Sequence, residues 1–325
     1  MRLPVFVDAN LIGQTPHGAR TYNVLNASGG LINQLTVPVY IQTDRRNTSL
    51  ASFNTGFSVA NTWYNSMAVT VRRPFANGLE FLMNYTWAKA SDTGQVQGAF
   101  GTFYGGDTPL DPNNIRAENG LSDIDIRNRM TMSVVYKPML FTENKWVKHA
   151  VDDFVFSATE IASGGQPIFL SMSGTVYSLG SYGAEGNIYG GAMSSSSGLP
   201  STGRAPQVGR NSIVGPGYND FDFRIARDIP IYENVKLQFT ADAFNLLNHT
   251  IITGVNGTYS QYTSAAATGT CSTGSQIPGT TAAPLQGCIA PFTGTGLQAF
   301  GATSSTSSSA LYGARQLQFS AKLNF

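Results

Sequence analysis

Residues 312–325 read YGARQLQFSAKLNF and alternate between apolar and polar side chains up to the final phenylalanine. The apolar positions of this stretch are Leu317, Phe319, Ala321, Leu323 and Phe325. A period of two residues indicates a β-strand with one apolar and one polar face. Terminal residues are commonly frayed and polar, so a strand that stays apolar to its last residue needs a partner for that face. Lipid outside and a polar lumen inside supply one, as in a transmembrane β-barrel.

Six further segments alternate in the same way. The clearest runs from Leu79 to Trp87, where Phe81, Met83 and Tyr85 lie on the face opposite Glu80, Asn84 and Thr86. Strands of about 9–11 residues match the span of a tilted strand through a bilayer. We therefore expect seven strands, at 62–73, 79–90, 128–137, 153–169, 218–228, 235–247 and 312–325. Residues 1–61 are expected to be mostly loop, with one partial strand near VPVYIQT (37–43).

Short and long connections alternate between these segments. The short ones are PFANG (74–78), residues 138–152 and the turn around PIYEN (230–234). The long ones are residues 91–127, 171–217 and 249–311. Loops beyond about 12–15 residues are uncommon in compact soluble domains, whereas outer-membrane barrels have short periplasmic turns and long extracellular loops. The sequence thus predicts an all-β, antiparallel transmembrane β-barrel in the outer membrane, with three long extracellular loops.

Seven strands cannot close a large barrel, and single-chain bacterial barrels normally have even strand counts. Open strand edges in lipid leave backbone groups unpaired at several kcal/mol each. The first residues, MRLPVFVDANLIG, carry an apolar run too short for a secretory signal. We therefore expect the chain to be a fragment, a partial barrel of about seven or eight C-terminal strands, with its missing partners upstream of Met1.

Composition narrows the classes of function. Charged residues make up 12% of the chain, about half the usual share of roughly 25%. The formal net charge of +1 gives no basic field for a nucleic acid. Phosphate-binding glycine loops and paired-cysteine zinc motifs are absent from the sequence. We expect no enzyme activity, no catalytic residue, no cofactor and no metal.

Several residues invite a catalytic interpretation that their context does not favour. The histidines, His17, His149 and His249, are scattered along the chain, and a hydrolase triad would have to use one of them. Asp92-Thr93-Gly94 spells the aspartic-protease tripeptide, but it follows KAS at the start of a loop rather than an apolar strand. Both patterns favour ordinary loop residues.

Binding residues are harder to assign. Five acidic residues before the third strand suit either a calcium site or a hydrogen-bonded loop, which we favour: Asp107, Asp111, Glu118, Asp123 and Asp125. Arg127 and Arg129 are expected to form ion pairs in the lumen or at the rim. Aromatic residues near the outer segments suit stacking on a sugar or peptide as well as anchoring and loop packing; they are Trp63, Tyr64, Tyr104, Tyr182 and Tyr189.

Two features concern export and assembly. Cys271 and Cys288 share one Gly/Ser/Thr-rich stretch, and a disulfide between them would fit an oxidising compartment, the alternative being two free thiols. Phe319, Leu323 and Phe325 look like the C-terminal signal that the barrel-assembly machinery reads. The same residues also stabilise lipid contact.

The segments also resemble a known family. NTWYNSMAVTVRRPFANGLEFLMNYTWAKASDTG (61–94) is similar to a segment of Oar-like TonB-dependent outer-membrane receptors, and DPNNIRAENGLSDIDIRNRMTMSVVYKP (111–138) looks like the next strand entry of that family. Further matches follow in the same order at ASGGQPIF, GRNSIVGPGYNDFDFRIARDIPI, VKLQFTADAFNLLNH and QLQFSAKLNF. The likeness covers about residues 60–325. One departure is Asn128, where the family often has histidine.

The resemblance implies more than the strands do. Receptors of this family have 22 strands, an N-terminal plug, a short segment that contacts TonB and, in Oar-like members, a carboxypeptidase-regulatory-like domain. The chain then corresponds to the C-terminal third of such a barrel. The implied function is energy-coupled import of a nutrient, an oligosaccharide or a peptide, with outer-membrane lipid, the barrel-assembly machinery and the TonB complex as partners. The alternatives are an adhesion or structural barrel and a small passive porin.

Overall fold

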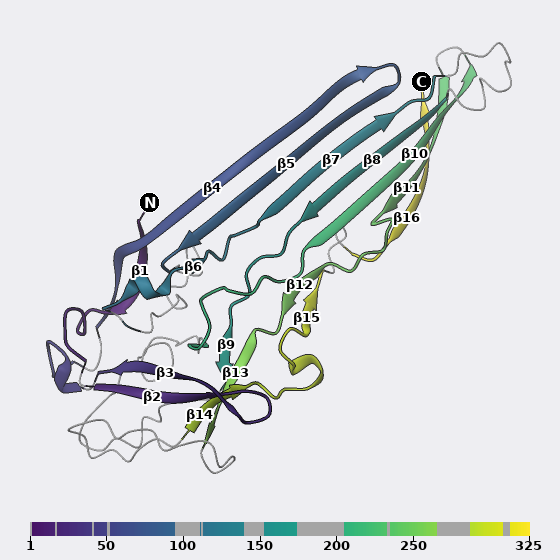
Figure 1. The fold of residues 1–325 in the computed structure, drawn as a ribbon. Coiled ribbons are helices and arrows are strands. Elements are labelled where there is room, and N and C mark those ends of the chain that lie inside the picture. The colour runs from purple at the N-terminus through teal and green to yellow at the C-terminus, as the bar shows by residue number, and fades with distance from the viewer. Residues whose placement is uncertain are drawn as a thin grey trace.

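The fold was analysed in a computed structural model, which describes residues 2–16, 18–40, 42–50, 53–94, 111, 113–139, 153–173, 205–232, 235–264, 287–307 and 313–325. These residues form β-strands with a few short 3-10 turns (Figure 1). Among them, no helix is long and apolar enough to cross a membrane. The all-β prediction is therefore confirmed.

One large antiparallel sheet dominates the molecule. It has nine strands, eight of them in the order β1-β4-β5-β7-β8-β10-β11-β16, with the two-residue β6 (Gly120–Leu121) pairing with β5. The bounds of the eight are β1 Arg2–Asp8, β4 Asn54–Ala76, β5 Leu79–Asp92, β7 Asn128–Tyr136, β8 Phe154–Ser163, β10 Tyr218–Tyr232, β11 Val235–Phe244 and β16 Gln316–Asn324. The seven segments that alternate in the sequence thus each contain a strand of this sheet, each paired with the next. β8 ends at Ser163, six residues before the predicted end.

The β4–β5 hairpin shows how local sequence sets the register. Asn77 and Gly78 have φ values of 52° and 78°, the left-handed backbone of a type I′ turn, for which Asn-Gly is the preferred pair. Gly78 also lies so close to the neighbouring strand that a Cβ there would be 2.1 Å from the Lys137 carbonyl oxygen. The turn pairs Ala76 with Leu79, and a register shift between Arg73 and Ala76 then places Val71 opposite Met83 and Val69 opposite Tyr85, so that the apolar residues of both strands share one face.

The same face continues across the sheet. Rows of paired residues run from β5 to β16, for example Leu79, Tyr136, Phe156, Ile225, Ala241 and Phe319. The apolar face is exposed along its length: Met67 is 55% exposed, Phe319 77% and Phe325 97%. Tyr136, Phe156 and Phe223 stack in sequence on this face, with ring centroids 6.4 Å apart in both pairs. Such a broad apolar surface indicates an apolar partner.

Residues 1–61 contain more strand than the one partial strand that the sequence predicts, and β3 overlaps that predicted strand. β1 pairs with the first half of β4, and β2 (Gly18–Leu25) and β3 (Leu31–Val39) form a hairpin. The alternation of these strands is interrupted by Pro, Gly and Asn, so their pairing comes from tertiary contacts that a period-two pattern does not show. β4 also begins at Asn54, eight residues before the predicted start.

The sequence predicts that the long connections are loops, but the structure shows short strands within them. They contain β9 (Ser171–Ser173), β12 (Ile252–Val255), β13 (Thr258–Ser264), β14 (Gly287–Pro291) and β15 (Thr303–Thr306). With the β2–β3 hairpin they build a second sheet in the order β3-β2-β14-β13-β9, while β12 pairs with β15. These strands are short and rich in Ser, Thr and Gly, and two of their pairings are parallel, so no alternation marks them in the sequence.

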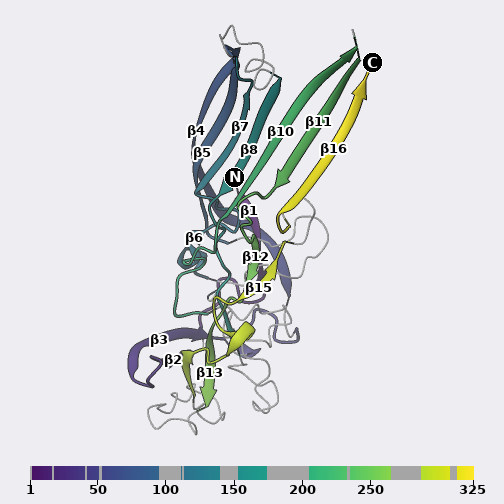
Figure 2. The ribbon, with the colours of Figure 1, turned by 90° about the vertical axis from the view of Figure 1, so that its right-hand side faces the viewer.

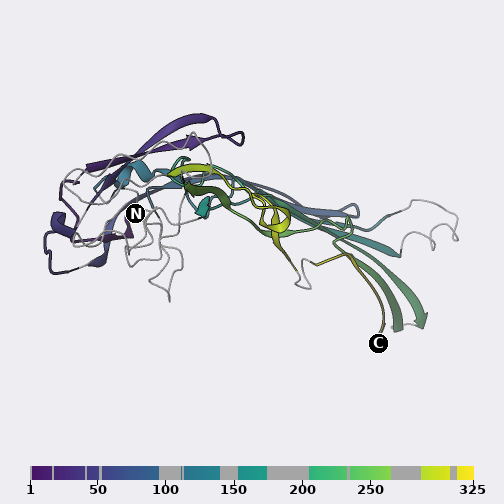
Figure 3. The same cartoon turned by 90° about the horizontal axis from the view of Figure 1, so that it is seen from below.

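The large sheet and the five-stranded second sheet lie at opposite ends of the molecule. The C-terminus and the β4–β5 and β10–β11 turns share one end of the large sheet, and the second sheet lies beyond the other (Figures 1 and 2). Seen from below, β10 and β11 curve away from β4 and β5 (Figure 3). The described strands form a curved, open sheet rather than a closed ring, with β16 paired only to β11 at one edge.

Candidate functional site: the polar face and the buried cluster beside it

The second face of the large sheet carries most of its polar side chains, and these bind one another across strands. Arg224 on β10 donates from Nε to Asp242 Oδ1 on β11, at 2.5 Å. Four residues further along β10, Asp228 Oδ1 accepts a hydrogen bond from Gln238 Nε2 at 2.8 Å. The contacts continue to the last strand, where the hydroxyl of Ser320 meets that of Thr240. The face is thus a hydrogen-bonded polar wall rather than a set of isolated charges.

The charges on this wall balance. By strand alternation its basic residues are Arg72, Arg129, Arg224, Lys236 and Lys322, and its acidic residues, apart from Asp92, are Glu80, Asp220, Asp222, Asp228 and Asp242. The wall therefore carries five charges of each sign, spread over several strands. A surface of this kind hydrates well and does not select strongly for one sign of charge.

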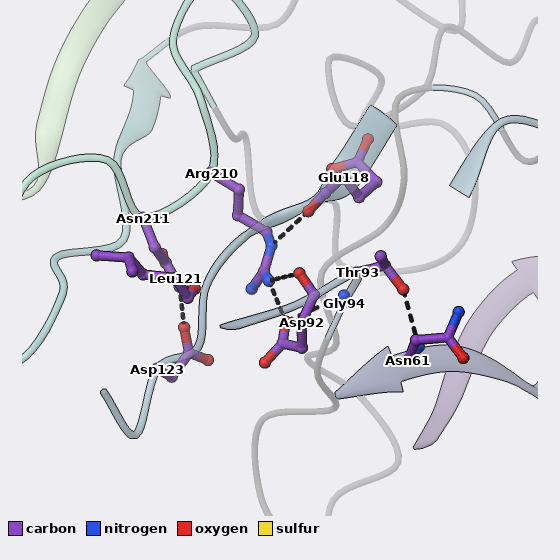
Figure 4. Close-up of polar contacts among 9 residues, drawn as sticks. All are labelled: Asn61, Asp92, Thr93, Gly94, Glu118, Leu121, Asp123, Arg210 and Asn211. Carbon is purple, nitrogen blue, oxygen red and sulfur yellow. Dashed lines mark hydrogen bonds and ion pairs between the residues drawn. The ribbon is translucent and has the colours of Figure 1, made fainter. Parts of the chain in front are cut away.

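A buried ion pair joins the wall to the segment before β10 (Figure 4). Arg210 donates to the Asp92 carboxylate at the end of β5, and also to the Asp92 carbonyl oxygen at 2.8 Å and the Glu118 carbonyl oxygen at 3.0 Å. Both charged side chains are within 1% of full burial. Three chain segments that are distant in the sequence meet at this one guanidinium group.

The next residue extends the cluster. Asn211, at a left-handed φ of 53°, donates to the Leu121 carbonyl oxygen at 2.9 Å and to Asp123 Oδ1 at 2.5 Å. Asp125 accepts a hydrogen bond from the Ala90 amide at 2.6 Å, and Arg127 lies 3.5 Å from its other oxygen. These contacts join residues 118–127 to the end of β5 and to the segment before β10.

The sequence motifs ASGGQPIF and FNLLNH are explained by close backbone packing. A Cβ on Gly165 would lie 1.8 Å from the Gly215 carbonyl oxygen, so only glycine fits where these two segments cross. In the second motif, Asn245 is buried, and its Nδ2 donates to the carbonyl oxygens of His249 and Gly313 at 2.9 Å each. Both motifs therefore shape the connections beyond the strands.

The N-terminal segment is held by a second polar group. Tyr40, 1% exposed, donates to Asp111 Oδ1 at 3.0 Å and accepts from Asn113 Nδ2 at 2.9 Å. Burial, with the Asp111 carboxylate close by, raises the pKa of Tyr40 to about 12. Asn113 also donates to the Leu11 and Gln14 carbonyl oxygens. The phenol is a structural tie and stays protonated at neutral pH.

Comparison with known proteins agrees with the geometry. The family model of the outer membrane beta barrel domain matches residues 3–318. The chain belongs to this family. No curated protein matches the chain. The protein is thus an outer-membrane barrel protein, which assigns the apolar face to lipid and the polar wall to the inside of the barrel.

The family match confirms the predicted outer-membrane location. Several predicted site residues can now be placed in the structure. Phe319 and Leu323 lie on the lipid face of β16, and Phe325 follows its last residue, Asn324. The recognition of these residues by the assembly machinery stays a prediction. Cys288 is fully buried and disulfide-bonded, while Cys271 lies outside the described residues, so their pairing also stays a prediction. His17, His149, Tyr104, Asp107, Tyr182 and Tyr189 lie outside the described residues as well.

The remaining candidate binding residues do not gather in one site. Trp63 and Tyr64 are 48% and 62% exposed on opposite faces of β4. Asp111 and the cluster around Asp123 and Asp125 belong to the two separate hydrogen-bonded groups above. In the described part of the chain, no group of His, Cys and acidic side chains is arranged to hold a metal ion.

The sequence did not reveal Arg210 or its pairing with Asp92. Asp92 was noted only for its chance likeness to a protease tripeptide, and Arg210 lies 118 residues further on. GRNS (209–212) gave no signal of its own, because an arginine beside an asparagine in a polar connection is ordinary for an exposed loop. Its burial could be recognised only from the fold.

Proposed function

We propose that the chain is the C-terminal portion of a TonB-dependent, Oar-like receptor barrel that imports a polar nutrient across the outer membrane. The whole receptor would have 22 strands, a plug and a TonB contact contributed by upstream sequence. The chain performs no covalent chemistry in this proposal. Its role is to supply barrel wall and outer binding surface.

The observation that carries the proposal is the polar wall inside the barrel. It runs from Arg72 on β4 to Lys322 on β16 with five charges of each sign. A solute that is polar but has little net charge can exchange its water for the hydroxyl, amide and paired ionic groups of such a wall. This favours an oligosaccharide or a small peptide over a strongly charged ion.

The structured outer end supports a receptor rather than an open pore. The connections there are tied by the Arg210–Asp92 pair, by Asn211 and by the second sheet. An ordered surface presents binding groups in fixed positions, which lowers the entropy lost when a ligand binds. A passive pore has no need of such order.

Uptake by cells that express the full-length protein tests the proposal. Labelled neutral oligosaccharides and peptides would be supplied with and without a protonophore, since TonB-driven import needs the proton-motive force. We expect uptake of one class, abolished by the protonophore and reduced in Arg224→Gln, with the lipid-facing Phe239→Leu as the matched control. Uptake that ignores the protonophore and falls only with solute size would instead indicate a porin.

One observation favours adhesion as the second candidate. The β2–β3 hairpin carries Leu31 and Ile32, 54% and 63% exposed, at the long-connection end of the molecule. Adjacent exposed aliphatic residues at a hairpin tip suit contact with another surface. Loss of cell aggregation, with no change in uptake, after replacement of both by Ser would favour this alternative.

A further inference from the structure

A small depression lies on the polar wall across β8, β10 and β11. Two residues of each strand, one on either side of a residue whose side chain points to the lipid face, surround it. These six, termed the wall pocket below, are Ser157, Thr159, Asp222, Arg224, Asp242 and Phe244. The pocket has a volume of about 210 Å³, below the range of about 300–1,000 Å³ for drug-sized ligands. Its size therefore suits one ring of a longer solute.

The register arranges the wall pocket as two rows across three strands. The first row consists of Ser157, Arg224 and Asp242, and the second of Thr159, Asp222 and Phe244, the last of which comes one residue after the final β10 partner on β11. Rows on one face are about 7 Å apart, and three strands span about 10 Å. Phe244 ends β11 and Asp222 lies near the start of β10. The wall pocket thus lies toward the long connections, on the extracellular side of such a barrel.

The carboxylate of Asp222 is held by the chain that follows β11. Its Oδ1 accepts a hydrogen bond from the Asn245 amide at 2.8 Å. Asn245 is itself buried and tied to two carbonyl oxygens through its side chain, so this donor has a fixed position. Among the described residues, no group donates to Asp222 Oδ2. A fixed carboxylate with one oxygen left to accept is a preorganised binding group.

The first row supplies donors. Arg224 uses Nε for Asp242 Oδ1, whereas its two terminal nitrogens bind no partner in the part of the chain that the structure describes. The Arg224 side chain is 56% exposed, so these nitrogens can reach a solute. The hydroxyl groups of Ser157 and Thr159 border the same pocket, and each can donate or accept.

The charges of the wall pocket select against ions of either sign. Asp222 and Asp242 against Arg224 leave one formal negative charge, which repels an anionic solute. The guanidinium group beside these carboxylates repels a cationic one. A neutral polar solute meets neither penalty, and it can use the donors and the acceptors together.

The aromatic ring narrows the choice to a sugar. Phe244 offers an apolar surface beside the polar groups, and a sugar ring has a C–H face that packs on such a surface while its rim of hydroxyl groups donates and accepts. Adjacent hydroxyls also suit paired contacts with a carboxylate and a guanidinium group. A peptide backbone offers only one donor and one acceptor per residue, fewer polar groups than one sugar ring.

We propose that the wall pocket binds one ring of a neutral oligosaccharide. The ring lies against Phe244, one hydroxyl donates to Asp222 Oδ2, and a second accepts from Arg224. The hydroxyls of Ser157 and Thr159 bind the remaining polar groups of the ring. This inference rests on the import function proposed above and names the class of nutrient.

Isothermal titration calorimetry with the full-length protein, purified from outer membranes in detergent, tests the pocket. The probes are neutral tetrasaccharides of glucose, galactose, mannose or xylose, with tetra-alanine and tetra-lysine as the peptide comparison. Asp222→Asn keeps an oxygen for the Asn245 amide but removes the charge, and Phe244→Leu keeps an apolar side chain but removes the ring. The matched controls are Asp228→Asn, further along the same face of β10, and Phe239→Leu on the lipid face of β11.

We expect the wild type and both controls to bind a tetrasaccharide and neither peptide. Asp222→Asn and Phe244→Leu should each weaken binding about tenfold, the effect of one charge-assisted hydrogen bond or one ring contact. Absence of saccharide binding in the wild type, equal affinity in all variants, an equal loss in the controls, or a preference for a peptide would each overturn the proposal. A heat-shift gel confirms folding, and either variant tests the pocket if the other does not fold.

The outcome is separable from that of the import proposal, because binding needs no proton-motive force. A saccharide that binds through the wall pocket but enters cells in the presence of the protonophore would contradict the import proposal alone. Energy-dependent uptake of a saccharide that the wild type and Asp222→Asn bind equally would contradict the wall pocket alone.

Discussion

Replacing Arg210 by Met should loosen the connections around the buried cluster while leaving the barrel strands intact. Among the described residues, Arg210 is the partner of the Asp92 carboxylate from another chain segment, and both side chains are within 1% of full burial. The change removes this partner. It also removes the donor to the Asp92 and Glu118 carbonyl oxygens. The side chain of Met fills similar space, so the effect reports on charge and hydrogen bonding.

The expected size follows from the burial. Breaking a buried ion pair by removing one partner costs about 3–5 kcal/mol, because the other charge stays buried without its counterpart. Asp92 Oδ2 already has no hydrogen-bond partner among the described residues. Without Arg210, the carboxylate keeps the Gly94 amide as its hydrogen-bond donor in the described part of the chain. A cost in this range lowers the protection of the local amides by about 100- to 4,000-fold.

Hydrogen exchange of the protein in detergent measures this opening. The reporters are the Ser122 amide, which donates to the Ala90 carbonyl oxygen at 3.1 Å, and the Asp125 amide, which donates to the Ser122 carbonyl oxygen at 2.9 Å. Amides in mid-strand, such as those of Met83 and Met132, serve as the internal control. The double variant Asp92→Asn/Arg210→Met should recover part of the loss, because it removes both charges of the pair.

The reasoning would be refuted by a change in protection below about fivefold at Ser122 and Asp125. It would be refuted equally by an even loss over the whole sheet, which would mean that the pair stabilises the barrel as one unit. A double variant less stable than Arg210→Met would show that the uncompensated charge is not the source of the cost.

Three further outcomes are expected. Phe325→Asn in the intact protein should reduce the amount of folded, heat-modifiable barrel in the membrane, and normal abundance would count against the assembly signal. The phenol of Tyr40 should ionise near pH 12, measured as the difference in ultraviolet absorbance between the wild type and Tyr40→Phe. The folded state holds this proton at pH values where the unfolded state has lost it, since a free tyrosine ionises near pH 10. The stabilisation is therefore complete below pH 10, and about 3 kcal/mol of unfolding free energy is lost as the pH rises to 12. Alkylation of the unreduced exported protein should label neither Cys271 nor Cys288, and rapid labelling of both would rule out the disulfide.

The strands were predictable where apolar and polar residues alternate. In β16 every second residue from Leu317 to Leu323 is apolar, and the Asn-Gly pair at 77–78 is typical of the tight turn that forms there. Period-two alternation and turn chemistry are local properties, so a single sequence carries them. The resemblance placed the same segments in the same order.

The rest depended on contacts between distant segments. β1 alternates poorly, and only its pairing with the first half of β4 makes it a strand. The parallel pairing of β14 with β2 joins residues more than 260 positions apart, and no local pattern specifies it. The same holds for Arg210, whose burial follows from the meeting of three connections rather than from the residues beside it.

The central claim is that the two faces of the large sheet meet lipid and a polar interior. Spin labels placed one at a time at residues 317–322, in membrane-embedded protein, test it most directly through collision with oxygen and with a water-soluble nickel complex. We predict that labels at 317, 319 and 321 collide mainly with oxygen and labels at 318, 320 and 322 mainly with the nickel complex. Equal accessibility along the strand, or the opposite alternation, would contradict the account.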